Sequence, residues 1–350
     1  MAVELAFSVR DLAQTRFAVS PMWEVGPSCR LLFSGAAGTH PVHRAWAAQV
    51  RPRLAAAGLD RSWLAELVPP SGYVPDFLNP APPGPGATLG EELARILTAP
   101  ADRIRADLDR LRDEQGRLGP RARGLHAAPR ERLPRLVEEI ETYWELAIAP
   151  YWARIRAVLD ADVFHRIRQI TEHGAAHLFH DLHPSVSWND DSLRLTRRRP
   201  LPRSSAGAGL LLIPSVFIGP VPFTRVTPPD PPQLAYPARG TGALWERRPA
   251  AAGGALAPVL GRSRALLLTE LETPATTTEL ARRTGLSTAG VSQYLAALRA
   301  AGLVSAHRAG RSVLYARTSA ADVLLTAAAG GPDPARRRAP ADPGAEPSEA

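Results

Sequence analysis

The residues best suited to contact a polyanion lie in the last fifth of the chain. Ser287 lies two residues after Gly285 and carries a hydroxyl that can cap a helix starting at residue 288. At 100° per residue, Val291, Leu295 and Leu298 share one face of that helix. The opposite face carries small or polar side chains, namely Ala289, Ser292, Gln293, Ala296 and Ala297. A face without large apolar side chains can enter a nucleic-acid groove.

A basic hairpin is predicted directly after this helix. Gly302 ends the helix, and residues 303–307 and 313–317 alternate in polarity as two strands. The turn between them carries Arg308 and Arg311, which suit contacts with phosphate or the minor groove. Residues 257–318 hold eight arginines against three glutamates, a net charge of +5 in a chain of net charge +8.

The elements before residue 288 must position this helix. Residues 259–271 are predicted as an apolar helix that ends before Pro274. Thr276 and Thr277 offer hydroxyls at the start of a short second helix, and Gly285 fits its left-handed C-terminal cap. Two helices joined by a short glycine-containing turn, the second with a polar outer face, are typical of a helix-turn-helix.

The stretch TTTELARRTGLSTAGVSQYLAALRAAGLVSAHRAGRSVLYART, within residues 257–325, resembles the winged-helix domain of the ArsR family of bacterial transcriptional regulators. The resemblance implies a homodimer that binds double-stranded DNA at an inverted-repeat operator, usually as a repressor, through helix 288–301 and wing 303–317. It directs attention to Thr277, Ser287, Thr288, Ser292, Gln293, Tyr294, Arg299, His307, Arg308 and Arg311 as DNA-binding residues. The alternative is a winged-helix protein-interaction module without sequence-specific DNA binding.

The chain departs from the metal-sensing members of that family. They place cysteines or His/Asp sets in the winged helix, whereas residues 257–318 contain no cysteine and only His307. A row of four histidines fits a solvated helix edge better than a metal site, and its members are His173, His177, His180 and His183. Cys29, the only cysteine, excludes an internal disulfide and is expected in the core. The sequence therefore predicts no metal site and no cofactor.

No enzyme is expected, because the chain has no P-loop, GxSxG, HExxH or glycine-rich dinucleotide turn.

The longest apolar stretch, residues 210–218, is interrupted by Pro214 and far shorter than the roughly 20 residues that span a bilayer. The first residues carry charges where a secretory signal needs an apolar run. A cytoplasmic location without a membrane partner is expected. All 42 basic residues are arginine, and the pI near 10.5 favours polyanionic partners.

At 350 residues, 45% apolar and 22% charged, the chain can bury at least two cores. The predicted fold class is α+β: a large mixed N-terminal domain over residues 1–246, with a helical bundle and a small antiparallel sheet, and a C-terminal winged helix-turn-helix over 259–325. Residues 247–258 are predicted as a linker and 330–350 as a disordered tail.

Helical periodicity in the N-terminal domain predicts Leu89–Leu97, Ala101–Gln115, Arg130–Leu159 with a break near Pro150, and Asp162–Leu182. A hairpin is predicted around residues 186–195. Tyr143, Trp144, Trp152 and Trp188 could line an apolar pocket, although core packing is the preferred interpretation. The hypothesis for this domain is dimerisation or the binding of an unknown effector.

Overall fold

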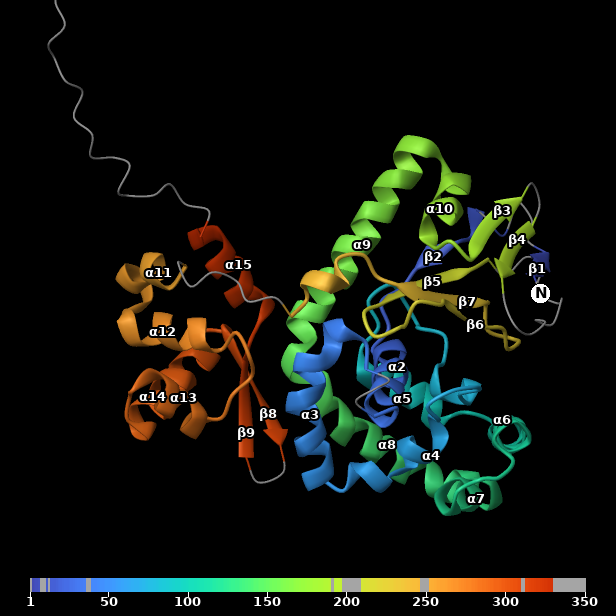
Figure 1. The fold of residues 1–350 in the computed structure, drawn as a ribbon, viewed down its shortest axis with the longest axis horizontal. Coiled ribbons are helices and arrows are strands. Elements are labelled where there is room, and N and C mark those ends of the chain that lie inside the picture. The colour runs from blue at the N-terminus through green and yellow to red at the C-terminus, as the bar shows by residue number, and fades with distance from the viewer. Residues whose placement is uncertain are drawn as a thin grey trace, which may run out of the picture. The chain divides into compact units, whose positions relative to one another are not determined.

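The structure is a computed structural model that describes residues 2–6, 11, 13–35, 39–189, 192–196, 209–245, 252–309 and 312–329. Two compact units divide the chain (Figure 1): residues 1–247 with 306–314, and residues 248–305 with 315–350. Both helices and sheets are present, which confirms the predicted α+β class. Among the described residues, no helix is both long and apolar enough to cross a bilayer.

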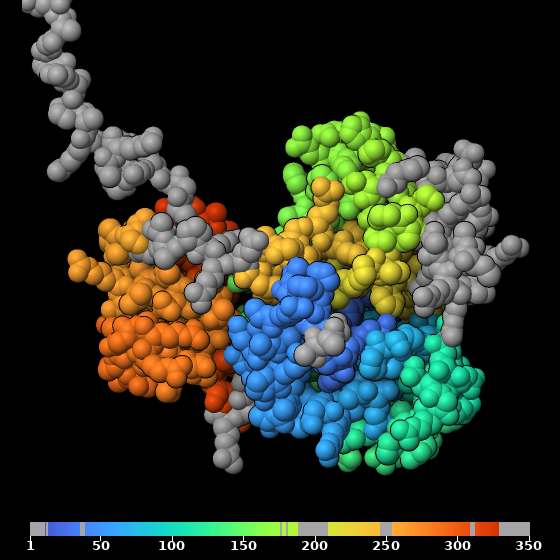
Figure 2. Space-filling view, in the orientation of Figure 1, coloured from blue at the N-terminus to red at the C-terminus, as the bar shows by residue number. Residues whose placement is uncertain are grey.

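A bundle of helices forms most of the first unit. Its α-helices are α2 (Met22–Phe33), α3 (Arg44–Ala56), α4 (Trp63–Leu67), α5 (Leu89–Leu97), α6 (Ala101–Gln115), α7 (Pro120–Ala127), α8 (Pro129–Ala147), α9 (Trp152–His173) and α10 (Ala175–Leu182). Short 3-10 turns are η1 (Pro41–His43), η2 (Leu59–Arg61), η3 (Asp76–Leu78), η4 (Ala149–Tyr151) and η5 (Thr241–Ala243). In Figure 1 the helices α2 to α8 gather on one side of the strands, and in Figure 2 the blue and teal atoms of residues in this region lie on the visible face.

The helix boundaries agree with the predicted ones where local signals are strong. Thr88 forms a capping box with Glu91 at the start of α5, and α5 and α6 have the predicted bounds. Pro150 lies in η4, which separates α8 from α9 as expected. The predicted break between Leu159 and Asp162 is wrong, because α9 runs through both residues and ends before Gly174, whose φ is +83°.

Two sheets accompany the bundle. The first is antiparallel, in the order β1 (Ala2–Ala6), β4 (Ser192–Thr196) and β3 (Val186–Asn189), so the predicted hairpin gains a third strand from the start of the chain. The second has the order β2 (Arg16–Phe17), β5 (Leu211–Ser215), β7 (Gln233–Pro237) and β6 (Phe223–Arg225).

The second sheet is mixed, so the small antiparallel sheet that the sequence predicts corresponds to the first one. The strand β5 pairs in parallel with both β2 and β7, and only β6 runs antiparallel to β7. Residues 216–222 carry the chain from β5 past the position of β7 to β6, and residues 226–232 then return it so that β7 lies between β5 and β6. Pro214, which cannot donate to a ladder, lies beyond Leu212, where the pairing with β2 ends.

The core of the first unit contains the aromatic side chains that had suggested a pocket. Tyr143 is fully buried and shares a hydrogen bond with Ser28 through hydroxyls 2.8 Å apart. Trp144 is 9% exposed, and its ring centroid lies 5.0 Å from that of Trp152. This packing supports the core interpretation. The side chain of Trp188 lies outside the described residues.

Buried carboxylates connect segments that are distant in sequence. Glu24 on α2 accepts hydrogen bonds from the backbone N–H of Val216 at 3.0 Å and from the hydroxyl of Ser215 at 3.1 Å. Burial raises the pKa of Glu24 to about 8. Glu92 on α5 accepts from Ser20 at 2.6 Å and from the N–H of Met22 at 2.8 Å. These contacts fix α2 against β5 and α5.

The second unit contains α11 (Ala252–Leu260), α12 (Arg262–Glu270), α13 (Thr277–Thr284), α14 (Thr288–Ala300) and α15 (Ser319–Ala329). The strands β8 (Val304–Ala309) and β9 (Ser312–Arg317) begin and end in this unit, although their residues 306–314 are grouped with the first. Residues 252–258, predicted as part of a linker, are helical and pack through Leu256 against α15. The predicted single helix over 259–271 is divided at Gly261, whose φ is +81°. The predicted disordered tail, residues 330–350, lies outside the described residues.

Candidate nucleic-acid interface

Local capping fixes the start and end of α13. The Thr276 hydroxyl accepts from the N–H of Glu279 at 3.2 Å, while the Glu279 carboxylate accepts from the N–H of Thr276 at 2.8 Å. Gly285, with a φ of +71°, ends the helix by donating to the carbonyl of Ala281 at 3.0 Å. Thr277 is the first residue of α13 and is half-buried. These contacts set the sharp turn that leads into α14.

The helix α14 presents the face that the sequence predicts. Ser287 caps it by accepting from the N–H of Gly290 at 3.1 Å. Val291, Leu295 and Leu298 are buried in the core of the unit. The outer side carries exposed Thr288, Ala289, Ser292, Gln293, Ala296, Ala297 and Arg299. This is a narrow polar surface that a DNA major groove can accommodate.

Tyr294 differs from the other predicted contact residues of α14 because it is half-buried and packs against the core. The guanidinium of Arg264, on α12, lies 5.6 Å from its ring centroid. A Cβ at Gly290 would come within 3.8 Å of the same ring and within 3.1 Å of the Ser287 hydroxyl. The structure therefore gives Tyr294 a packing role at the edge of the polar face.

The wing is the two-stranded sheet of β8 and β9. Arg308 is exposed at the end of β8, and His307 beside it is half-buried. Arg311, predicted at the tip of the wing, lies outside the described residues. The N–H of Ala275 donates to the carbonyl of Tyr315 at 3.1 Å and the reverse bond is 2.9 Å, which anchors β9 to the segment before α13.

One of the eight arginines of this segment has a structural role that the sequence does not reveal. Arg317 is 9% exposed and donates from Nε to the carbonyl of Leu268 at 2.6 Å and from Nη2 to that of Thr269 at 2.5 Å. Its Nη1 lies 3.5 Å from the Asp322 carboxylate on α15. It caps the last turn of α12, where carbonyls lack helical partners.

The remaining described arginines of this segment are exposed, and they are Arg262, Arg264, Arg282, Arg283, Arg299 and Arg308. Arg283 donates to the hydroxyl of Thr273 at 3.4 Å. The glutamate of the capping box, Glu279, is half-buried and engaged with Thr276. The net positive charge of the segment is therefore carried on its surface, where it can neutralise phosphates.

The helix α15 was not predicted from the sequence. It packs on α11, and Leu256, Ala265 and Leu325 form a small apolar layer between α11, α12 and α15. Its start has a local signal, since the hydroxyl of Thr318 accepts from the N–H of Ala321 at 3.4 Å. The same helix carries Val323, which is 68% exposed.

The histidine row of the first unit has geometry of its own. The rings of His173 and His177 lie 4.8 Å apart, edge to face. His183 uses both ring nitrogens, on the hydroxyl of Ser185 at 2.7 Å and the carbonyl of Pro220 at 2.7 Å. The side chain of His180 lies outside the described residues. Within the described part of the chain, no group of three His, Cys, Asp or Glu side chains is placed to hold a metal ion.

Comparison with known families agrees with this geometry. Residues 262–306 match the family model "Bacterial regulatory protein, arsR family". The match begins at α12 and ends in β8, so it includes both helices of the helix-turn-helix. No curated protein and no solved structure matches the chain significantly. The predicted resemblance is confirmed for this segment, and the first unit is an additional region outside it.

Proposed function

Because residues 262–306 form a regulatory helix-turn-helix domain of the arsR family, which binds DNA, we propose that the protein is a homodimeric transcriptional repressor of the cytoplasm. It recognises an inverted-repeat operator through α14 and the wing. The observation that carries this proposal is the outer face of α14, where Ser292 and Gln293 stand exposed between small alanines. Phosphates on either side are neutralised by exposed arginines such as Arg299 and Arg308.

Within this face, Gln293 is the residue suited to direct readout. A glutamine amide can donate to N7 and accept from N6 of an adenine as a bidentate pair. Thr288 and Ser292 flank it and can contact either base edges or phosphates. We expect weaker contacts with DNA from His307 and Thr277, which are half-buried, and from Ser287, whose hydroxyl already caps α14.

The proposed homodimer is supported by exposed valines on two helices of the second unit that pack on each other. Val259 on α11 is 79% exposed and Val323 on α15 is 68% exposed. A twofold axis through such a surface would give two copies of α14 for the two half-sites. The first unit would then enlarge the dimer or bind an effector that alters operator affinity.

Selection from a random duplex library tests the proposal. We expect enriched sequences to be inverted repeats whose half-site centres are separated by about 10 base pairs, one helical turn, or a multiple of it. A control selection uses Gln293→Ala, which should lose the preference at one base pair per half-site. Enrichment of no sequence by the native protein would contradict the proposal and favour a protein-interaction module.

The role of the first unit is tested by truncation. A chain that starts at Ala252 keeps α11, which packs on α15, whereas a later start would remove part of that layer. If the first unit only binds an effector, this chain should dimerise and bind the operator like the full protein. Loss of the dimer in a folded truncated chain would instead assign dimerisation to the first unit.

A further inference from the structure

An arginine with unsatisfied hydrogen-bonding capacity lies in the interior of the first unit. The side chain of Arg225, on β6, is 2% exposed. Its Nη2 donates to Oδ2 of Asp230 at 2.9 Å. Its Nε and Nη1 are buried and have no hydrogen-bond partner among the described residues. A buried cation with unpaired donors is costly, so this site needs a further acceptor.

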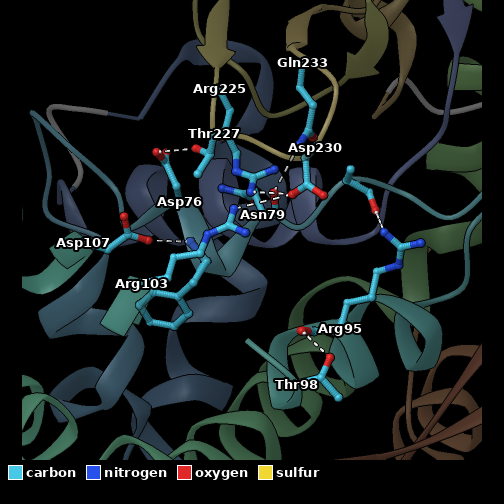
Figure 3. Close-up of polar contacts among 12 residues, drawn as sticks. Asp76, Asn79, Arg95, Thr98, Arg103, Asp107, Arg225, Thr227, Asp230 and Gln233 are labelled. Atoms are coloured by element: carbon cyan, nitrogen blue, oxygen red, sulfur yellow. Dashed lines mark hydrogen bonds and ion pairs between the residues drawn. The ribbon is translucent and has the colours of Figure 1, made fainter. Parts of the chain in front are cut away.

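A second arginine converges on the same carboxylate oxygen (Figure 3). Arg103, on α6, places Nη2 3.5 Å from Oδ2 of Asp230, although the two residues are 127 positions apart. The Nε of Arg103 is also buried without a partner among the described residues. Nε–H and Nη2 form one edge of a guanidinium, the edge that matches two oxygens of an anion. In both arginines, Nη2 contacts the Asp230 carboxylate and Nε has no hydrogen-bond partner among the described residues.

The neighbouring carboxylates of Asp107 and Asp76 do not accept hydrogen bonds from the unpaired guanidinium nitrogens, because they accept from other groups. Asp107 accepts from the hydroxyl of Tyr73 at 2.8 Å and from the N–H of Phe77 at 2.8 Å. Asp76 accepts from the hydroxyl of Thr227 at 3.0 Å. Burial raises the pKa of Asp107 to about 6 and also raises that of Asp76, while the positive charge of Arg103 opposes both shifts.

The cluster extends from the surface to the interior. The side chains of Arg103 and Asp230 are 22% and 23% exposed, whereas Arg225 lies beneath them. Asp230 belongs to the connection between β6 and β7, and its N–H donates to the carbonyl of Thr227 at 3.1 Å. The buried carbonyl oxygen of the Asn79 amide also lacks a partner among the described residues, next to Gln233, which contacts the Asn79 backbone. The unsatisfied groups thus comprise three donors and one acceptor.

We propose that this cluster is a binding site for a small oxyanion, a carboxylate or phosphate group, held by the guanidinium groups of Arg103 and Arg225. Asp230 already contacts Nη2 of both arginines, so the oxyanion competes with its carboxylate for the Nε–Nη2 edges of the two guanidinium groups. The acceptor on Asn79 suits a hydroxyl carried by the same ligand. This site belongs to the first unit and does not depend on DNA binding by the second.

Calorimetric titration of the full-length protein near neutral pH, in a chloride buffer free of oxyanions, tests the site. Inorganic phosphate and sodium acetate are the two probes, and the one that binds more tightly identifies the chemistry. We expect one site per chain. Arg103→Gln should weaken binding by about tenfold, since it removes one charged donor group. Arg105→Gln is the matched control on α6, because the Arg105 side chain is 41% exposed and pairs with Asp102, and this variant should bind like the native protein.

A third variant tests the competing carboxylate. Asp230→Asn removes the internal charge and should strengthen binding of the probe. The proposal is overturned if neither probe binds the native protein, or if folded Arg103→Gln binds like the native chain. The second result would place the anion on the basic surface of the other unit. Weaker binding by Asp230→Asn would overturn the role of Asp230.

Discussion

Arg317 donates from Nε to the backbone carbonyl of Leu268 at 2.6 Å, joining the last strand of the wing to the end of α12. From the sequence alone, Arg317 would be counted among the arginines that contact DNA phosphates. Its burial and its three partners instead assign it to the framework that holds the wing beside the helix-turn-helix. Charge counts alone therefore overstate the number of phosphate contacts in this segment.

Arg317→Ala should destabilise the second unit by about 1 to 3 kcal/mol, because it removes the side-chain donor to the carbonyl of the buried residue Leu268. The free energy of unfolding, from urea titration followed by circular dichroism, measures this effect. Arg308→Ala is the matched control, since Arg308 is exposed on the same wing, and its stability should stay within about 0.5 kcal/mol of the native value. Equal stabilities for the two variants would contradict the framework role.

Gln293→Ala should reduce affinity for the selected operator by about 1 to 3 kcal/mol and relax the preference at one base pair per half-site. The reason is that its exposed amide is the group on α14 best suited to bidentate contact with a base. Fluorescence anisotropy with operators substituted at each position measures both effects. Ala297→Ser, on the same exposed face, provides a control for a change without amide loss. An unchanged base preference in Gln293→Ala would remove this residue from direct readout.

Val259→Glu and Val323→Glu should each weaken the dimer by about tenfold or more, because a carboxylate replaces an apolar side chain in the proposed interface. Sedimentation velocity over a concentration series measures the dissociation constant. Val221→Glu is the control, since Val221 is 53% exposed on the first unit. If all three variants dimerise like the native protein, α11 and α15 do not form the interface.

Acid should destabilise the first unit through His43. Burial lowers the pKa of His43 to about 4, with repulsion from His40 as a smaller cause. The neutral ring fits this, because its Nδ1 accepts from the indole N–H of Trp245 at 3.0 Å. A histidine whose folded-state pKa lies below the unfolded value near 6.5 contributes stability above that pH and loses it as the pH falls towards 4.

The comparison of native protein with His43→Gln isolates this contribution, since glutamine can accept a hydrogen bond but does not titrate. Between pH 7 and pH 5, the native protein should lose about 2 kcal/mol more stability than the variant. Urea unfolding at the two pH values gives the difference. His177→Gln, at an exposed position, should behave like the native chain. The same pH dependence in His43→Gln would contradict the assigned role of His43.

The elements that sequence could predict were those with local signals. Thr276, Gly285 and Ser287 carry their capping information within a few residues, so the helix-turn-helix appears where predicted. The inner face of α14 follows from helical periodicity alone. Helix α15 was missed because its alanine-rich sequence shows little helical periodicity of large apolar residues. Its apolar side chains are explained only by their packing against α11.

The features that the sequence could not predict depend on contacts between segments that are distant in the chain. The pairing of β1 with β4 joins Ala2 to Thr196, and no turn signal specifies such a register. Arg103 and Arg225 meet at Asp230 only because α6 and the β6–β7 connection are packed together by the core. The two carbonyl partners of Arg317 are likewise 48 and 49 residues away. Composition and spacing could not reveal these sites.

The most direct test of DNA binding by α14 and the wing is the salt dependence of affinity for the selected operator. For the native protein, the logarithm of the association constant should fall linearly with the logarithm of salt concentration, by about 0.9 per neutralised phosphate. Arg308→Ala should weaken binding to all sequences and reduce this slope by about 0.9, since it removes one phosphate contact. An affinity independent of salt, or an unchanged slope in Arg308→Ala, would contradict the proposed interface.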